Sequence, residues 1–306
     1  MSLIEKAAAK LKKGESLVER AAKKLEKTSV MDGGTAFPAR KKPLISEVNT
    51  SRLNVNDDVL AKSKRVDLNL DILHQKNIQT NEDEDSITME EFRIVKRSLL
   101  LNAFAKGDAA IKNGNIILVT STQPDEGKTF CAVSLAMSMA AERDLTVLLV
   151  DADVSKPDVL KTLGIKGGKG LIDVIENKDM DLRECLIRTN ISNLTILPAG
   201  KKHRLTTELL ASGRMGEIID EIARRYHDRV IIIDSPPVLA SSAASVLALH
   251  VGQILYVVEA EKTREEELGD ALKMIEKCKN INLLLNKARF TAGKKRFGSY
   301  YGYGKE

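Results

Sequence analysis

Tryptophan is absent from this chain, and aromatic residues make up only 4% of its 306 positions. Proteins that bind single-stranded nucleic acid usually stack the bases on several aromatic side chains, so this class is not expected. The 48 basic and 43 acidic residues leave a net charge of only +5, which does not by itself indicate a polyanionic partner. We therefore expect no nucleic-acid binding.

Cysteine is also scarce: Cys131, Cys185 and Cys278 lie far apart and form no Cys-x-x-Cys pair. A zinc site or a disulfide framework is therefore not expected, and the composition fits a reducing cytoplasm. No apolar run typical of a signal peptide occurs near the N-terminus. Residues 235–258 carry no charge, but they include two prolines, several serines and a histidine. We interpret this stretch as a buried helix and strand rather than a membrane span.

Residues 1–28 contain a repeat, because the Ser-Leu-Ile-Glu that begins at Ser2 returns as the Ser-Leu-Val-Glu that begins at Ser16. Each copy begins with a capping box and places apolar residues on one stripe of a helix. This arm could dock on a protein, lie on a membrane surface, or remain a solvated helix pair without a partner. Residues 29–86 have no sustained periodicity and predict a partly disordered linker.

From residue 87 the chain alternates apolar strands with helical patterns, after an opening helix of about twenty residues. Strands are predicted at 116–120, 146–151, 194–197, 230–234, 254–258 and 283–286. Helices are predicted at 128–143, 208–225, 240–250 and 264–279. Short apolar strands between helices indicate an α/β fold with a mostly parallel sheet that is covered on both faces, over residues 87–290. Residues 291–306 are basic, then rich in glycine and tyrosine, and predict a flexible tail.

A phosphate-binding loop is predicted between the first of these strands and the helix that follows it. The sequence Gly127-Lys128-Thr129 begins the helix, where backbone N–H groups and the helix dipole favour phosphate. Lys128 would reach the β- and γ-phosphates, and the Thr129 hydroxyl would ligate magnesium. The Walker A pattern has glycine at the position of Thr122, which is a departure from that pattern.

Three carboxylates follow other predicted strands. Asp151 and Asp153 end the second strand, and Asp234 ends the strand at 230–234. The carboxyl ends of parallel strands meet at one edge of a sheet, so these groups should lie beside the phosphate loop. Together with Lys128 they predict a magnesium–phosphate site.

These motifs resemble the bacterial tyrosine kinases, the P-loop autokinases that regulate polysaccharide export. The resemblance rests on residues 123–129, 149–153 and 231–237, with further matches at 170–174 and 285–287. The repeat at the N-terminus is similar to that of soluble, exosortase-associated members, whose transmembrane chain-length partner is a separate protein. The resemblance therefore implies a P-loop NTPase fold and a cytoplasmic protein that is recruited to the inner face of the membrane by this partner.

The resemblance also implies residue roles. ATP would be bound by the loop, the next residue and one position at the last strand: Gln123, Pro124, Asp125, Glu126, Gly127, Lys128, Thr129, Phe130 and Asn286. Magnesium would be held by Thr129, Asp153 and Asp234. Asp151 would accept the proton of the attacking tyrosine hydroxyl. Lys128 and Asp151 are thus the expected catalytic residues.

Three of the five tyrosines, Tyr300, Tyr301 and Tyr303, lie in the last seven residues, which suggests a tail that is phosphorylated by a neighbouring subunit. Homo-oligomers are implied, with Glu90, Arg93 and Lys96 at the interface; lysine stands at position 96 where the family has arginine.

Two alternatives stay open. One is a partitioning or division-site ATPase, although Gln123 occupies the place of the signature lysine of that class. The other is a nucleotide-binding adaptor without catalysis.

Overall fold

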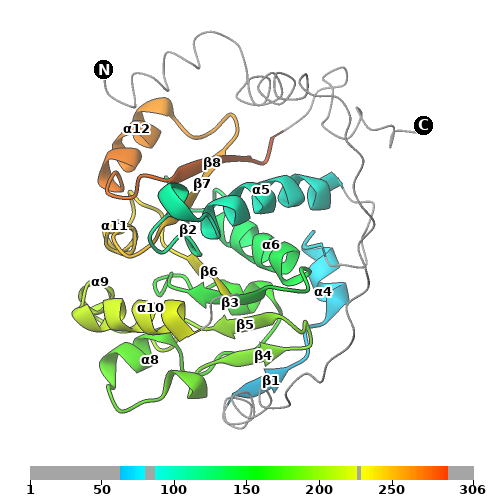
Figure 1. Cartoon of the computed structure of the whole chain (residues 1–306), viewed down its shortest axis with the longest axis vertical. Coiled ribbons are helices and arrows are strands. Elements are labelled where there is room, and N and C mark those ends of the chain that lie inside the picture. Colours follow the sequence, from blue (N-terminus) through cyan, green and yellow to red (C-terminus); the bar gives the residue numbers. More distant parts are fainter. Residues whose placement is uncertain (1–62, 80–86, 226–228, 289–306) are drawn as a thin grey trace, which may run out of the picture. The chain divides into compact units, whose positions relative to one another are not determined.

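The computed structural model describes residues 63–79, 87–225 and 229–288 (Figure 1). The predicted N-terminal arm and C-terminal tail, including Tyr300, Tyr301 and Tyr303, lie outside these ranges. Among the described residues, no helix is long and apolar enough to span a membrane.

The strands within these ranges form one eight-stranded sheet with the order β1-β4-β5-β3-β6-β2-β7-β8. Every neighbouring pair is parallel except β4 and β5, which are antiparallel. The strands are β1 (Lys64–Val66), β2 (Ile116–Ser121), β3 (Thr146–Asp151), β4 (Ile187–Thr189), β5 (Leu194–Leu197), β6 (Arg229–Asp234), β7 (Gln253–Glu259) and β8 (Ile281–Asn286). The parallel α/β architecture predicted from the sequence is therefore confirmed.

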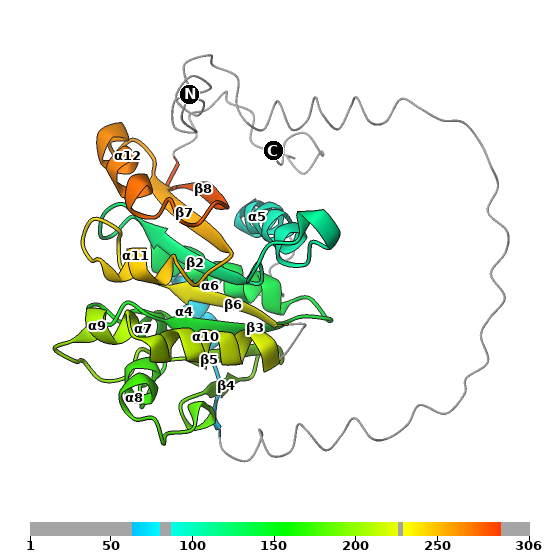
Figure 2. The ribbon, with the colours of Figure 1, turned by 60° about the vertical axis from the view of Figure 1, so that its left-hand side comes forward.

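Helices pack on both faces of this sheet (Figure 2). One face is covered by α4 (Leu70–Gln75), α5 (Ile87–Ala103), α6 (Lys128–Ala140) and α7 (Val159–Thr162). The other is covered by α8 (Leu171–Glu176), α9 (Thr206–Leu210), α10 (Gly213–Arg225), α11 (Ala243–Leu247) and α12 (Glu265–Met274). Two one-turn 3₁₀ helices, η2 (Gly107–Ala109) and η3 (Leu182–Glu184), lie in connecting segments.

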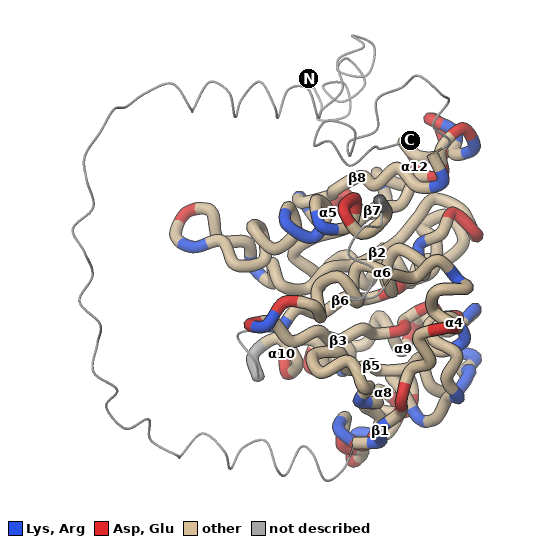
Figure 3. The backbone as a smooth tube through the Cα atoms, turned by 90° about the vertical axis from the view of Figure 1, so that its right-hand side faces the viewer, with Lys and Arg blue, Asp and Glu red and all other residues tan. Residues whose placement is uncertain are grey.

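The central strands are short apolar runs because both of their faces are covered. All six residues of β2 are buried, as are the last five of β3 and of β6. Figure 3 shows these strands almost free of charged positions until their carboxyl ends, while basic and acidic residues alternate over the surrounding segments. In β2, β3 and β6 the acidic residues therefore stand only at the carboxyl ends, and the other charged residue, Arg229, begins β6.

The segment 63–79 lies within the range for which the sequence predicts a linker, yet it forms part of the sheet. β1 pairs with β4, and Leu68, Leu73 and Ile78 are buried under the sheet face that also holds α6. These three buried residues lie five positions apart, a spacing that matches neither helical nor strand periodicity. Their pattern therefore predicts neither a helix nor a strand here. The folded domain therefore begins before residue 87.

The helix predicted at 208–225 is two helices in the structure. α9 ends at Leu210 and α10 begins at Gly213, because Ser212 interrupts the run with a bond from its hydroxyl to Leu209 O at 2.6 Å. A serine that binds a carbonyl of the preceding turn competes with the helical pattern.

Candidate active site

The loop between β2 and α6 has the conformation of a phosphate-binding turn. Gly127 has φ +96° and directly precedes the first residue of α6. Asp125 also has positive φ, at 65°. A Cβ at position 127 would overlap with Nδ2 of Asn286, so glycine is required both for the backbone conformation and for the space.

Glu126 holds this loop in shape. Its buried carboxylate accepts hydrogen bonds from the backbone N–H of Thr122 at 2.7 Å and of Gln123 at 3.0 Å, and from the hydroxyl of Thr263. The Thr122 hydroxyl lies 2.9 Å from the hydroxyl of the fully buried Tyr256 in β7. Thr122 thus replaces the expected glycine while its side chain is bound by the neighbouring strand. The roles of Tyr256 and Thr263 were not predictable from the sequence, because both contacts span more than 130 residues.

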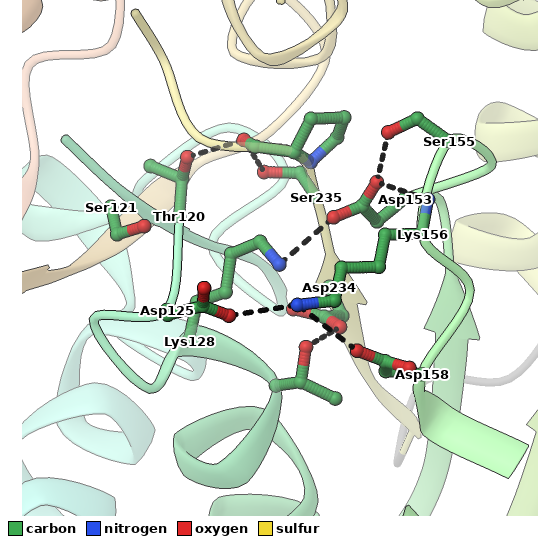
Figure 4. Close-up of polar contacts among 12 residues, drawn as sticks. Thr120, Ser121, Asp125, Lys128, Asp153, Ser155, Lys156, Asp158, Asp234 and Ser235 are labelled. Carbon is green, nitrogen blue, oxygen red and sulfur yellow. Dashed lines mark hydrogen bonds and ion pairs between the residues drawn. The ribbon is translucent and has the colours of Figure 1, made fainter. Parts of the chain in front are cut away.

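Lys128 forms a buried ion pair with Asp153 across the site, with 2.8 Å between Nζ and Oδ2 (Figure 4). Burial disfavours the charged amine, but the carboxylates of Asp234 and Asp153 outweigh this effect and raise the pKa of Lys128. The lysine therefore carries its positive charge at neutral pH. Asp153 Oδ1 accepts from the Ser155 hydroxyl at 2.6 Å and from the Lys156 N–H at 3.1 Å, so the loop after β3 is folded around this carboxylate.

Asp151 and Asp234 are directly paired in register at the ends of β3 and β6. Burial raises the pKa of Asp151 to about 8, and the charge of Asp234 adds to this effect. Burial likewise raises the pKa of Asp234 to about 7, against the opposing effects of Lys128 and Thr129. Neighbouring buried carboxyl groups with such raised pKa values are typical of functional sites.

Asp151 has a defined orientation. Its Oδ1 accepts the N–H of Asp153 and its Oδ2 accepts the N–H of Val159, both at 3.2 Å. Both bonds favour the ionised carboxylate, and they lower the pKa that burial raises.

The residues present fit a magnesium ion. The Thr129 hydroxyl donates to Asp234 Oδ2 at 2.7 Å, while the buried Oδ1 of Asp234 has no hydrogen-bond partner among the described residues. No group of three or more acidic, histidine or cysteine side chains in the described ranges forms a complete metal cage. This arrangement suits Mg²⁺, which takes one or two carboxylates and fills its other positions with water and substrate phosphate.

The end of β8 lies against the phosphate loop. Asn286 Nδ2 donates to Glu126 O at 2.9 Å, and Lys287 Nζ donates to Asp125 O at 2.7 Å. Lys156 reaches the same loop through Asp125, at 2.7 Å. The structure therefore brings together the predicted loop residues 123–129 and the distant Asn286.

The remaining predicted residues lie away from this centre. The ring of Phe130 packs edge-on against Phe92 of α5, with 6.3 Å between the centroids. On α5, Glu90 and Arg93 pair with each other on the surface at 2.9 Å. Lys96 donates to Ser138 O in α6 and to the carboxylate of Glu142, which follows that helix. Its ammonium group is therefore already paired within the subunit.

Comparisons with known proteins agree with this geometry. The family model described as AAA domain matches residues 114–287. The tyrosine-protein kinase YwqD of Bacillus subtilis (strain 168) is 28% identical over 231 residues, which cover 75% of this chain and 91% of that protein. The tyrosine-protein kinase wzc of Salmonella typhimurium (strain LT2) is 32% identical over 158 residues, which cover 52% of this chain but only 21% of that longer protein.

Among solved structures, the kinase domain of the Escherichia coli tyrosine kinase ETK superposes with a TM-score of 0.61 at 25% identity. The match covers 70% of this chain and 81% of that domain.

Proposed function

The chain belongs to the AAA-domain family and, within it, to the bacterial tyrosine-protein kinases, and on this premise we propose that it transfers the γ-phosphoryl group of ATP to its own C-terminal tyrosines. The observation that carries this proposal is the convergence of Asp151, Asp153 and Asp234, at and after the ends of β3 and β6, with Lys128 at the start of α6. A P-loop with three converging carboxylates provides the parts that phosphoryl transfer requires.

The loop residues 123–129 would bind the phosphates of ATP. The N-terminus of α6 offers backbone donors and a positive dipole end, and Lys128 offsets the charge of the transferred group. Thr129, Asp153 and Asp234 would hold Mg²⁺, directly or through water, and a bound Mg²⁺ neutralises charge on the phosphate oxygens. Asn286 would complete the nucleotide site at the edge of the loop, whereas the ring of Phe130 packs against α5 and its contact with ATP stays a prediction.

Asp151 is the proposed general base. The tyrosine oxygen attacks the γ-phosphorus, the bond from that phosphorus to the bridging oxygen breaks, and ADP leaves. The phenolic proton moves to the Asp151 carboxylate, which the N–H groups of Asp153 and Val159 hold in place.

Tyr300, Tyr301 and Tyr303 are the proposed acceptors, and we assign the transfer to a neighbouring subunit of a homo-oligomer. The tail leaves the domain after Lys287, whose amine contacts the phosphate loop. The thirteen residues from Lys287 to Tyr300 span up to about 43 Å, which is long enough to leave the subunit's own site and to extend toward a neighbour. Length alone therefore does not decide between transfer within and between subunits.

Mixing two inactive variants decides this point. One variant carries Lys128→Met and an intact tail; the other has an intact site with Tyr300, Tyr301 and Tyr303 changed to Phe. Incubation with ATP and Mg²⁺ should place phosphotyrosine on the Lys128→Met chain. If this chain stays unmodified while the wild type labels itself at a rate that does not change on dilution, transfer occurs within the subunit.

The partitioning-type ATPase is separated from the kinase by the same assay. That class hydrolyses ATP without modifying its own tyrosines, so ATP turnover with no phosphotyrosine on the wild type would favour it. A nucleotide-binding adaptor would give neither product.

The biological role that we propose is control of exopolysaccharide synthesis or export, through a membrane-anchored chain-length partner. Deletion of residues 1–28 should reduce association with this partner and leave autophosphorylation within about twofold of wild type, because these residues precede every site residue. A large loss of thermal stability on deletion would show instead that the arm belongs to the folded domain.

A further inference from the structure

The catalytic edge of the sheet is supported by a segment that no nucleotide motif includes. β1 and α4, at residues 63–79, precede the phosphate loop by more than 40 residues in sequence. They nevertheless pack on the sheet face that carries α7, and α7 begins at Val159, after the loop that follows Asp151 at the end of β3. The contacts between α4 and α7 define how this support works.

Lys76, at the end of α4, binds the C-terminal end of α7. Its Nζ donates to Lys161 O at 2.5 Å and to Thr162 O at 2.9 Å. Lys161 O also accepts the N–H of Gly164 at 3.3 Å, so the amine of Lys76 adds a further bond there, and a cation at this end also complements the helix dipole. α7 has only four residues and is too short to be stable alone, so it depends on contacts with neighbouring elements, and the bonds from Lys76 are among them.

A close apolar contact adds to this bond. Gly164 follows α7 with φ +71°, and a Cβ there would lie 3.2 Å from Cγ2 of Ile72 in α4. Val159 and Leu163, on α7 and at its end, are fully buried in the same apolar cluster as Leu73. A methyl group at Gly164 would therefore be in tight contact with Ile72, which would have to shift by a few tenths of an ångström.

The opposite end of α7 reaches the reacting centre. The first N–H of α7, that of Val159, donates to Asp151 Oδ2 at 3.2 Å. A shift of α7 by a fraction of an ångström would lengthen this bond and leave Asp151 with the N–H of Asp153 alone. Displacements of about 1 Å in positioning groups commonly cost about 100-fold in rate.

We infer that Lys76 is a positioning residue for phosphoryl transfer: it fixes α7, and through the Val159 N–H it fixes the orientation of Asp151. This inference rests on the proposed role of Asp151. It links residues 63–79 to the proposed base without passing through the nucleotide loop.

The test compares Lys76→Ala, Lys76→Arg and the control Lys166→Ala in the full-length chain. Lys166 is exposed near the end of α7, and no polar contact of its side chain to another described residue is found. Lys76→Ala should lower the rate of autophosphorylation at saturating ATP by about 5- to 50-fold. Its affinity for ATP with Mg²⁺, measured by binding, should stay within about twofold of wild type. Lys76→Arg should recover at least half of the rate, and Lys166→Ala should match the wild type.

Equal losses of rate and nucleotide affinity, or a rate for Lys76→Ala within twofold of wild type, would overturn the inference. Hydrogen exchange provides a readout that needs no catalysis: amides of residues 159–163 should exchange faster in Lys76→Ala, while those of α6 should not change. If the wild type forms no phosphotyrosine, the proposed function fails. The exchange result would still decide whether Lys76 holds α7, and unchanged exchange at 159–163 would refute it.

Discussion

Lys128 and Asp153 form a buried ion pair, with 2.8 Å between the amine nitrogen and Oδ2. In the proposed complex Lys128 would bind the γ-phosphate, whose negative charge replaces that of Asp153. Asp153 would bind Mg²⁺, whose positive charge replaces that of Lys128. The pair therefore keeps both charges in place within a site that would otherwise hold an unpaired buried charge.

Replacement of Lys128 by Met should lower autophosphorylation by about 100-fold or more, because the charge on the γ-phosphoryl group loses its cation. Lys156→Ala is the matched control, since Lys156 is exposed and pairs with Asp125 at the rim. Its rate should stay within about threefold of wild type. Quantitative phosphotyrosine detection checks both variants. Comparable losses of rate in the two would contradict the specific role of Lys128.

Asp151→Asn should retain nucleotide binding and lose transfer. Removal of a general base typically costs about 10²- to 10⁴-fold in rate, whereas the loop that binds the phosphates is unchanged. Binding of a fluorescent ATP analogue with Mg²⁺ and the rate of phosphotyrosine formation measure the two effects separately. Retention of most of the wild-type rate would disprove the base assignment.

The stability of the metal-free protein should fall as pH rises from about 5 to 8. Burial raises the pKa of Asp151 to about 8 and that of Asp234 to about 7, against an ordinary value of 3.8. The folded state then binds more protons than the unfolded state across this window, so the free energy of unfolding decreases with pH. Each group costs at most about 1.4 kcal/mol per pH unit.

Thermal unfolding in a chelator at several pH values measures this slope. Asp151→Asn removes one of the two groups and should flatten the slope, and Mg²⁺ should stabilise the wild type more at pH 8 than at pH 6. A slope identical in wild type and Asp151→Asn would contradict the prediction.

Gly127→Ala should abolish nucleotide binding with modest loss of stability. The added Cβ meets Asn286 at a residue whose φ of +96° L side chains rarely adopt. Gly168→Ala serves as control, because a Cβ there meets nothing within 4 Å. Calorimetric titration with ATP and Mg²⁺ should show wild-type affinity for the control and no binding for Gly127→Ala.

The sequence alone predicted the strands that carry the site, because β2, β3 and β6 are unbroken apolar runs that each end in polar residues. It also predicted that Asp151, Asp153, Asp234 and Lys128 meet, since parallel strands share one carboxyl edge. The antiparallel pair β4–β5 was not predicted, because the three residues of β4 carry no detectable period.

The interactions that hold the site in place were not predictable in the same way. Glu126 appears in sequence as one more loop residue, whereas in the structure its carboxylate binds two loop N–H groups and Thr263. Lys76 lies in a range without periodicity, and its partners are backbone carbonyls 85 and 86 residues away. Contacts of a side chain with a distant backbone leave no pattern in composition or spacing.

The chain enters the sheet at β1 and leaves it at β8, which are its two opposite edges. A force applied between the two ends would thus act across the strands and open the sheet one ladder at a time. The ladder from β4 to β5 joins two residue pairs and that from β1 to β4 joins three, whereas that from β3 to β6 joins six. Under tension β1 and β4 would separate first, and β3 and β6, which carry Asp151 and Asp234, would remain paired.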